Sequence, residues 1–266
     1  MDPLISVVVL DWLSLILIGA VVGVMVGMTG VGGGSLMTPI LTLWLGYPPL
    51  VAVGTDLCFA AITKSAGVWA HRRSGNINGV ILRRLLEGSA LGLVFGVVLM
   101  TVLDAEQANA LLRPLIGVTV GATGLILLWQ TYIRRQANPS PVNALSRDWL
   151  AMKTRVVGML IAMLVVLTSI GAGAIGMTAL IWLYPTLSQS RLAATDIAYA
   201  VPLTVVASLV HIVSGNVDWG LLLGLLLGSI PGITAGAMLV SRLPELVSRG
   251  LLVALLLAVS LKMLVG

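Results

Sequence analysis

Two glycine-rich segments have the composition of an anion-binding loop. The first runs from Gly30 to Ser35 with the sequence GVGGGS, and the second runs from Gly171 to Gly176 with the sequence GAGAIG. Glycine has no Cβ to keep a ligand from the backbone amides, and a helix that follows such a loop directs its positive dipole end at the ligand. The alternative is close helix packing, because glycine is frequent in membrane helices. The loops predict an anion site built from Gly32, Gly33, Gly34 and Ser35 in the first segment and from Gly171 and Gly173 in the second.

An acidic and a basic side chain lie in one otherwise apolar segment. Asp56 and Lys64 are eight residues apart, which is about 12 Å along a helix and nearly on one face. A charge inside a membrane is costly and by default suggests function. Lys64 is therefore predicted to neutralise a bound anion, with Thr55 and its counterpart Thr195 as further ligands. The alternative is a structural ion pair of Lys64 with Asp56 or Glu87.

Asp56 and Asp196 each follow a threonine at the start of an apolar segment. Threonine and aspartate are good N-cap residues, so both carboxylates could simply cap helices. Alternatively each carries a proton, because removal from water favours the neutral form of a carboxyl. A proton on such a group removes its repulsion for a bound anion and so couples the two. The hypotheses are compatible, and Asp56 and Asp196 are the predicted proton-coupling residues.

His71, His211 and Cys58 are further side chains with reactive or metal-binding chemistry. Each histidine ends an apolar segment, where the helix dipole favours an imidazolium, so both are interpreted as caps or interfacial groups. A single cysteine excludes an internal disulfide and any cysteine metal cluster, and it is interpreted as a small apolar filler. We therefore expect no metal, no cofactor and no catalytic residue.

The composition is that of a polytopic membrane protein. Of 266 residues, 58% are hydrophobic and only 9% are charged, against roughly a quarter in an average soluble domain. So few charges cannot cover a water-soluble surface, and so hydrophobic a chain is not disordered. The apolar runs are unbroken, whereas a transmembrane β-barrel needs alternation. The net charge of +5 forms no basic face, so membrane lipid is an expected partner and nucleic acid is not.

Ten apolar stretches divide the chain, five on each side of a polar linker. A full crossing needs about 20 residues, so the stretches at 36–46 and 177–187 are predicted to be half-helices or limbs of re-entrant hairpins. The other eight are 12–29, 50–71, 79–103, 109–133, 155–170, 193–213, 219–241 and 246–265. The predicted fold is all-α, with a first membrane repeat at 1–133, a cytoplasmic linker at 134–152 and a second membrane repeat at 153–266.

The two halves are copies of one unit. A shift of 140 residues, with no gap between residues 31 and 99, relates the following positions: Thr55-Asp56 to Thr195-Asp196, His71 to His211, and the glycines at 88, 92 and 96 to those at 228, 232 and 236. Leucine and glycine match by chance in apolar sequence, but aspartate and histidine in one register do not. The sequence therefore predicts an internal duplication.

Lysine and arginine near the membrane predict how each half is oriented. The linker region holds basic residues at 134, 135, 147, 153 and 155, which places it in the cytoplasm. Residues 72–84 hold four arginines, whereas their counterparts at 212–224 hold none. Matching loops are thus predicted on opposite sides of the membrane, with both termini outside. Inverted repeats of this kind are typical of secondary transporters.

Three longer runs carry a resemblance to a known family. They are GMTGVGGGSLMTPIL and AVGTDLCFAAITKSAGVWAHRRSGNI in the first half and TDIAYAVPLTVVASLVHIVSGNVDWGLLLGLLLGSIPG in the second. They resemble the sulfite exporter TauE/SafE family, and the resemblance covers nearly the whole chain outside residues 134–152. The second glycine segment departs from an all-glycine pattern at Ala172, Ala174 and Ile175, which indicates that the two loops are not equal in role.

The resemblance implies a transporter of small sulfur-containing anions, such as sulfite, thiosulfate or organosulfonates, in the bacterial cytoplasmic membrane. Export is the direction that the family name implies, and proton coupling through the two aspartates is a hypothesis. The chain holds no nucleotide-binding P-loop, so transport is expected to use a gradient. The alternatives are a passive anion channel and, less favoured, an intramembrane sulfur-handling enzyme. A homodimer is compatible with the sequence.

Overall fold

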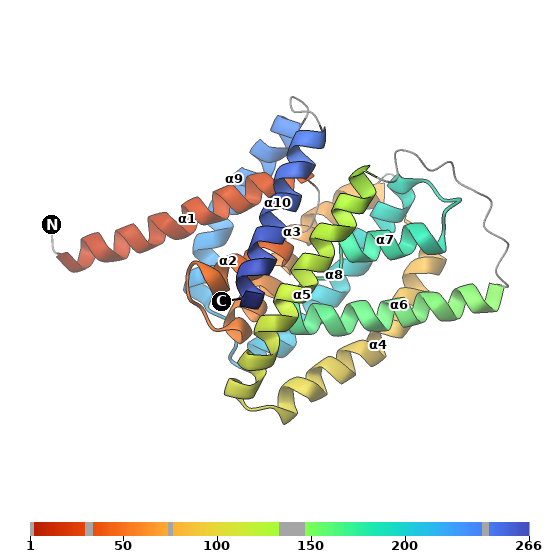
Figure 1. Cartoon of the computed structure of the whole chain (residues 1–266), viewed down its shortest axis with the longest axis horizontal. Coiled ribbons are helices and arrows are strands. Elements are labelled where there is room, and N and C mark those ends of the chain that lie inside the picture. The colour runs from red at the N-terminus through yellow and green to blue at the C-terminus, as the bar shows by residue number, and fades with distance from the viewer. Residues whose placement is uncertain (1–2, 30–33, 74–76, 133–146, 241–244, 266) are drawn as a thin grey trace.

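The chain is helical throughout the part that the structure describes. The computed structural model describes residues 3–29, 34–73, 77–132, 147–240 and 245–265, and in these ranges it has ten α-helices and no strand (Figure 1). This result confirms the predicted all-α fold. The helices are α1 (Pro3–Thr29), α2 (Gly34–Leu43), α3 (Pro49–Arg73), α4 (Gly79–Val102), α5 (Ala105–Tyr132), α6 (Arg147–Thr168), α7 (Ala174–Leu183), α8 (Gln189–Val213), α9 (Trp219–Val240) and α10 (Glu245–Val265).

Five stretches of helix in the described part are long and apolar enough to cross a membrane. Their outward side chains are apolar: Phe95 of α4 and Leu227 of α9, for example, are each 60% exposed. Such a surface is stable in lipid, where helices satisfy their own backbone polar groups. The chain is therefore a multi-pass membrane protein, as predicted. The five stretches are Gly79–Val102, Ala105–Gln130, Asp148–Thr168, Gln189–Val213 and Trp219–Gly236.

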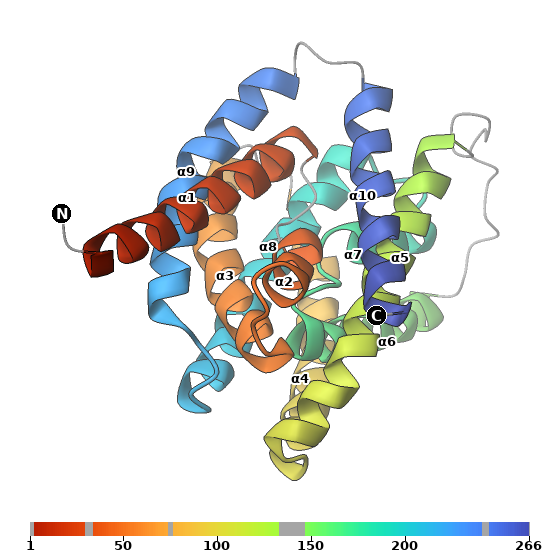
Figure 2. The same cartoon turned by 60° about the vertical axis from the view of Figure 1, so that its left-hand side comes forward.

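The helices α2 and α7 are half-length, as the sequence predicts. Each has 10 residues, which is about 15 Å of helix and half of a hydrocarbon core of about 30 Å. Residues 34–39 at the start of α2 are buried, and Figure 2 shows this helix in the middle of the molecule. The first residue of α7, Ala174, is also buried. Both short helices thus begin inside the protein.

Helices of one half pack on helices of the other half. The helix α1 lies along α9, and α4 lies along α6 (Figures 1 and 2). Glycine makes these approaches close: a Cβ on Gly88 of α4 would overlap the Arg155 carbonyl oxygen of α6, and a Cβ on Gly228 of α9 would overlap the Ile16 carbonyl oxygen of α1. Gly88 and Gly228 are the positions that the duplication relates, so the two pairs of helices pack in the same way.

The partner helices carry matching glycines as well. A Cβ on Gly158 of α6 would overlap the Leu85 carbonyl oxygen, and a Cβ on Gly19 of α1 would overlap the Leu225 carbonyl oxygen. Leu85 and Leu225 are again related by the shift of 140 residues. Each pair therefore interlocks through small residues on both helices, which is a common way for membrane helices to approach closely. The two halves share these interfaces and do not pack as separate bodies.

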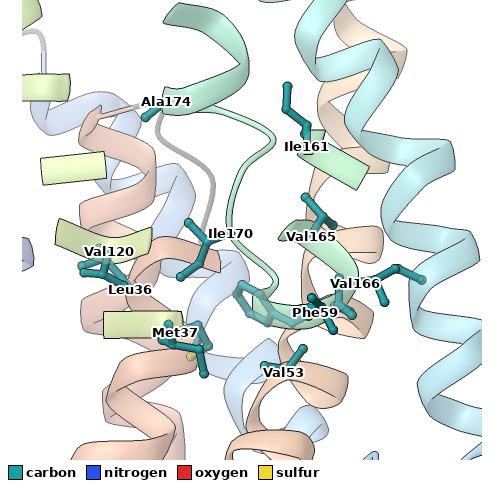
Figure 3. Packing of buried hydrophobic residues seen from close by; sticks show 14 of the residues in the cluster. Leu36, Met37, Val53, Phe59, Val120, Ile161, Val165, Val166, Ile170 and Ala174 are labelled. Atoms are coloured by element: carbon teal, nitrogen blue, oxygen red, sulfur yellow. The ribbon is translucent and has the colours of Figure 1, made fainter. Parts of the chain in front are cut away.

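The apolar core lies where the two halves meet. Leu36 and Met37 of α2, Phe59 of α3 and Ile170 from the α6–α7 loop are buried together (Figure 3). Both half-helices begin inside the protein, and this brings their first residues and the loop before α7 into the interior. The helix α6 begins at Arg147, so the last part of the range predicted as linker, 134–152, is helical.

Candidate functional site

The first glycine segment is described from Gly34 onward, while the predicted ligands Gly32 and Gly33 lie outside the described residues. Gly34 and Ser35 are the first residues of α2, and both are buried. A Cβ on Gly34 would overlap the carbonyl oxygen of Ser169, which belongs to the other half of the chain. Glycine at position 34 therefore lets the start of α2 touch the loop that precedes α7.

The loop between α6 and α7, residues 169–173, includes the first three residues of the second glycine segment and has unusual backbone angles. The φ angles are 61° at Ser169, 138° at Gly171 and 129° at Gly173. These values lie in a region that glycine enters readily and other residues enter rarely, which explains the two glycines. Gly173 is the N-cap of α7 and has no side chain to cap it, so the first turn of that helix is left accessible to other groups.

The described residues of the two glycine segments line one small pocket. The pocket is lined by the first residues of both short helices and by the hydroxyl side chains of Thr123 and Ser169, neither of which was predicted as a ligand. Helix N-termini favour anions through their dipole and their unpaired N–H groups. The pocket is lined by Gly34, Ser35, Thr123, Ser169, Ile170, Gly171, Ala172, Ala174 and Ile175.

Lys64 of α3 reaches this pocket from the opposite half. Its Nζ donates a hydrogen bond of 3.4 Å to the carbonyl oxygen of Ala172, which lines the pocket. Asp196 and Asp56 both act electrostatically on this ammonium, and Asp196 has the larger effect. Among the described residues neither carboxylate forms an ion pair with Lys64 within 4.0 Å. The Lys64 ammonium therefore interacts electrostatically with both carboxyl groups and forms an ion pair with neither.

The alternative pairing of Lys64 with Glu87 is wrong. Glu87 accepts from Arg83 Nε and from Arg155 Nε, each at 2.8 Å, on the partly exposed α4–α6 surface. Arg83 lies one turn before Glu87 on α4, and Arg155 lies on α6, so both carboxylate oxygens are already paired. Lys64 is consequently not part of this surface network.

The hypothesis that Asp56 and Asp196 cap helices is wrong, because both lie well inside a helix. The helix α3 begins at Pro49, and α8 begins at Gln189 with Ser188 as its N-cap. Both carboxyl groups are buried, with Asp56 fully inaccessible and Asp196 4% exposed. In each of them Oδ1 has no hydrogen-bond partner. An ionised carboxylate with an unpaired oxygen is costly to bury, so these residues call for a functional explanation.

The two carboxyl groups have different neighbours. Asp56 Oδ2 accepts a hydrogen bond of 2.6 Å from Thr38 Oγ1 of α2. Asp196 lies at the start of α7, beside the backbone of Gly173, and a Cβ on Gly176 would overlap its Oδ1. Asp196 thus occupies the helix N-terminus that an anion would use, whereas Asp56 is held by a hydroxyl.

Thr55 and Thr195, both predicted as ligands, make the same contact in the two halves. The backbone N–H of Asp218 donates to Thr55 Oγ1 at 3.1 Å, and the backbone N–H of Asn78 donates to Thr195 Oγ1 at 3.0 Å. Asn78 caps the start of α4, and Asp218 precedes α9 and accepts from Leu221 N in the corresponding way. Neither threonine lines the pocket. These contacts favour a structural role in joining the halves.

His211 is not an interfacial group, in contrast to the interpretation of the sequence. It lies near the end of α8 as expected, but it is fully buried, with Nε2 3.0 Å from the Val166 carbonyl oxygen and Nδ1 without a partner. The side chain of His71 lies outside the described part. Cys58 is buried beside Ser208 of α8. No group of three metal-binding side chains occurs in the described ranges.

Ser169 and the Ala172 carbonyl were missed by sequence reasoning. A backbone carbonyl gives no signal in a sequence. Ser169 gave a weak one, since it is one of two adjacent polar residues at the end of an apolar run, two positions before a glycine segment. Both belong to the loop that Lys64 and the start of α2 contact.

Half-helices that begin at a shared interior pocket, next to an intramembrane cation, are features of secondary membrane transporters. A sequence model of the sulfite exporter TauE/SafE family matches residues 15–263, which is nearly the whole chain. The chain therefore belongs to the sulfite exporter TauE/SafE family and is a membrane transporter. As a multi-pass membrane protein in bacteria, it lies in the cytoplasmic membrane.

Two relatives are similar along most of their length. The chain is 32% identical to the "Probable membrane transporter protein YjnA" of Bacillus subtilis over 253 residues, which cover 94% of this chain and 99% of the relative. It is 28% identical to the "Probable membrane transporter protein YdhB" of the same species, over 88% of this chain and 92% of the relative. No solved structure matches the chain significantly.

Proposed function

We propose that the protein is a secondary transporter that exports small sulfur-containing anions, such as sulfite, thiosulfate or organosulfonates, together with protons. The anion lies between the two glycine segments, at the starts of α2 and α7. The family supports this substrate class. Gly34, Ser35, Gly171 and Gly173 contribute the backbone and hydroxyl groups in the described part of this site, and Gly32 and Gly33 remain predicted ligands.

The observation that carries the proposal is the contact of Lys64 Nζ with the Ala172 carbonyl. It places the ammonium of one half at the glycine loop of the other half. An anion that enters the pocket replaces this long contact to a neutral carbonyl oxygen by an ion pair with the ammonium, in which donor and acceptor are both charged. Lys64 is thus the positive charge of the site, and the starts of α2 and α7 add their dipoles.

Proton coupling follows from the charge balance around Lys64. One ammonium faces two buried carboxyl groups, Asp56 and Asp196, so with both ionised the region is negative and repels an anion. Asp196 also lies at the start of α7 and competes with the anion for that site. Protonation of a carboxyl therefore admits the anion, and anion binding promotes proton uptake by the same free energy.

Alternating access in this proposal is a movement of the two halves against one another. The equivalent contacts of α1–α9 and α4–α6, and those of Thr55 and Thr195, support a twofold relation between the halves. Such a relation gives inward-open and outward-open states of similar energy. The opposite orientation of the halves in the membrane is the prediction made from their arginine distribution.

The first experiment measures anion binding and transport by the purified protein. Thiosulfate is a suitable probe because it keeps its charge across the neutral pH range, so that pH effects report the protein. Lys64→Met should weaken thiosulfate binding by about tenfold to a hundredfold, the equivalent of roughly 1.5–3 kcal/mol. Thr204→Val, at the counterpart of Lys64, is the matched control. Equal affinity in wild type and Lys64→Met would overturn the site.

Transport in proteoliposomes separates a coupled carrier from a channel. An inward proton gradient should drive thiosulfate against its own concentration gradient in a carrier. A passive channel would only dissipate the thiosulfate gradient. The topology is tested with single cysteines in a Cys58→Ala background: positions 138–146 should be inaccessible, and positions 104–107 and 215–218 accessible, to an impermeant thiol reagent outside intact cells. Labelling of 138–146 from outside would overturn the inversion.

A further inference from the structure

Ser169 has a backbone conformation that needs an explanation. Its φ angle of 61° is the one positive value among the described non-glycine residues. Such conformations are held in place by their surroundings and gather at functional sites. Here the start of α2 holds the residue, because the Gly34 backbone packs directly on the Ser169 carbonyl oxygen. The loop is thus fixed by contact with the other half of the protein.

The Ser169 hydroxyl is buried and unpartnered. The residue is 4% exposed, and its Oγ has no hydrogen-bond partner. A buried hydroxyl is usually paired, so an unpaired one at a pocket points to a ligand or water that completes it. Ser169 lines the pocket between the glycine segments, where the anion is proposed to bind.

The same side chain lies beside Asp56. Its hydroxyl is near the Asp56 carboxyl but outside hydrogen-bonding geometry, since Ser169 Oγ and Asp56 Oδ1 both lack a partner. Asp56 itself does not line the pocket, and its other oxygen, Oδ2, is held by Thr38. Met37 and Ile170, which are next to Thr38 and Ser169 in the chain, belong to the buried apolar cluster (Figure 3). Ser169 therefore lines the pocket and also interacts with the Asp56 carboxyl.

We propose that Ser169 is a positioning residue that relays protons between the pocket and Asp56. The proposal rests on the proposed function, in which Asp56 carries a proton. In each transfer a water or acid in the pocket gives a proton to Ser169 Oγ, while the hydroxyl proton of Ser169 passes to Asp56 Oδ1. One O–H bond breaks and one forms at Ser169, so the serine stays neutral and one proton reaches the carboxylate.

The charges that act on this route are few. Lys64 and Cys58 lie on the same helix as Asp56, and Lys64 also interacts with Asp196 of α8. The buried His211 of α8 packs against α3 at Gly54, two residues before Asp56. The helix α2 and the loop at 169–173, which pack against Asp56 from the other sides, bring hydroxyl groups and no ionisable side chain. The proposed relay delivers its proton to Asp56, whose charge Lys64 balances.

Two substitutions distinguish the effect of losing the Ser169 hydroxyl from the effect of relieving the backbone strain at this residue. Ser169→Ala and Ser169→Gly both remove the relay, but glycine also relieves the strain at φ 61°, so Ser169→Gly should be the more stable variant. Both should slow proton-driven thiosulfate transport by tenfold or more, with thiosulfate affinity within threefold of wild type. Thr204→Val is the matched control, because it removes a buried hydroxyl that donates within its own helix and contacts neither Asp56 nor the pocket. It should keep a transport rate within threefold of wild type.

The outcomes distinguish the relay from the proposed function. Wild-type transport and pH profile in Ser169→Gly would overturn the relay, as would a fall in transport matched by an equal fall in thiosulfate affinity, which would make Ser169 an anion ligand. If Asp56→Asn loses the pH dependence of transport while Ser169→Gly keeps it, only the relay fails. If Asp56→Asn itself keeps the wild-type pH profile, the proton site of the proposed function fails.

Discussion

The two halves of the protein are alike where they join and different at the centre. Gly88 and Gly228 meet carbonyl oxygens of the opposite half in the same register. At the pocket the equivalence ends: Lys64 corresponds to Thr204, which keeps its hydroxyl in its own helix by donating to Ala200 O. In the proposed mechanism, the duplicated scaffold provides symmetric movement, while one half alone provides the positive charge.

A second difference lies on the helices that carry the aspartates. Tyr199 of α8 accepts a hydrogen bond of 2.8 Å from Ser89 Oγ and donates one of 3.0 Å to the Gly158 carbonyl oxygen. Its counterpart on α3 is Phe59, which has no hydroxyl and can form neither bond. The helix α8 is therefore tied to α4 and α6 by a polar network, while the corresponding position of α3 packs through apolar contacts alone.

The largest effect is expected from breaking the shared interfaces. Gly88→Ala and Gly228→Ala should each destabilise the protein by about 3 kcal/mol or more, because the added methyl meets a backbone carbonyl that cannot move aside. Gly79→Ala is the matched control on α4, where a Cβ meets nothing within 4 Å, and should be neutral or slightly stabilising. Thermal unfolding in detergent measures all three. A severe effect at one glycine and none at the other would contradict the equivalence of the halves.

Substitution of Asp196 and substitution of Asp56 should have different effects on thiosulfate binding and on transport. Asp196→Asn removes the charge that competes with an anion at the start of α7, so thiosulfate affinity at neutral pH should rise by about tenfold, or about 1.4 kcal/mol, and lose its pH dependence. Asp56→Asn should change affinity less and remove the pH dependence of the transport rate. Calorimetric titration at several pH values and proteoliposome flux measure the two. Indistinguishable behaviour of the variants would show that the two sites are equivalent after all.

Much of the scaffold was predictable, because apolar runs bounded by polar residues determine membrane helices. The half-length of α2 and α7 followed from the short runs at 36–46 and 177–187. The capping hypothesis failed because α3 begins at Pro49 and α8 at Gln189, about two turns before each aspartate. Three features depend on tertiary packing, which residue types and spacing do not encode locally. They are the packing of α1 and α4 on helices of the other half, the position of the Ala172 carbonyl and the burial of His211.

A smaller effect is expected from removing the polar network of α8. Tyr199→Phe makes this position resemble Phe59 and loses two buried hydrogen bonds, which should cost about 1–3 kcal/mol. Ser89→Ala removes one of the same bonds and should cost less. The midpoint of thermal unfolding measures both, with thiosulfate binding as the control for the site. A stability unchanged in Tyr199→Phe would mean that the asymmetry of the two helices has no energetic consequence.

The smallest effect tests whether the two halves are joined equally. Thr55→Val and Thr195→Val each remove one hydroxyl that accepts a backbone N–H at the start of a helix of the other half, from Asp218 or Asn78. One neutral hydrogen bond contributes about 0.5–1.5 kcal/mol, and the two values should agree within the error of the measurement. Thiosulfate affinity should be unchanged in both variants, because neither threonine lines the pocket. A clear loss of thiosulfate affinity in either variant would show that this threonine binds the anion. Unequal losses of stability would mean that the halves are held together more strongly at one side of the membrane than at the other.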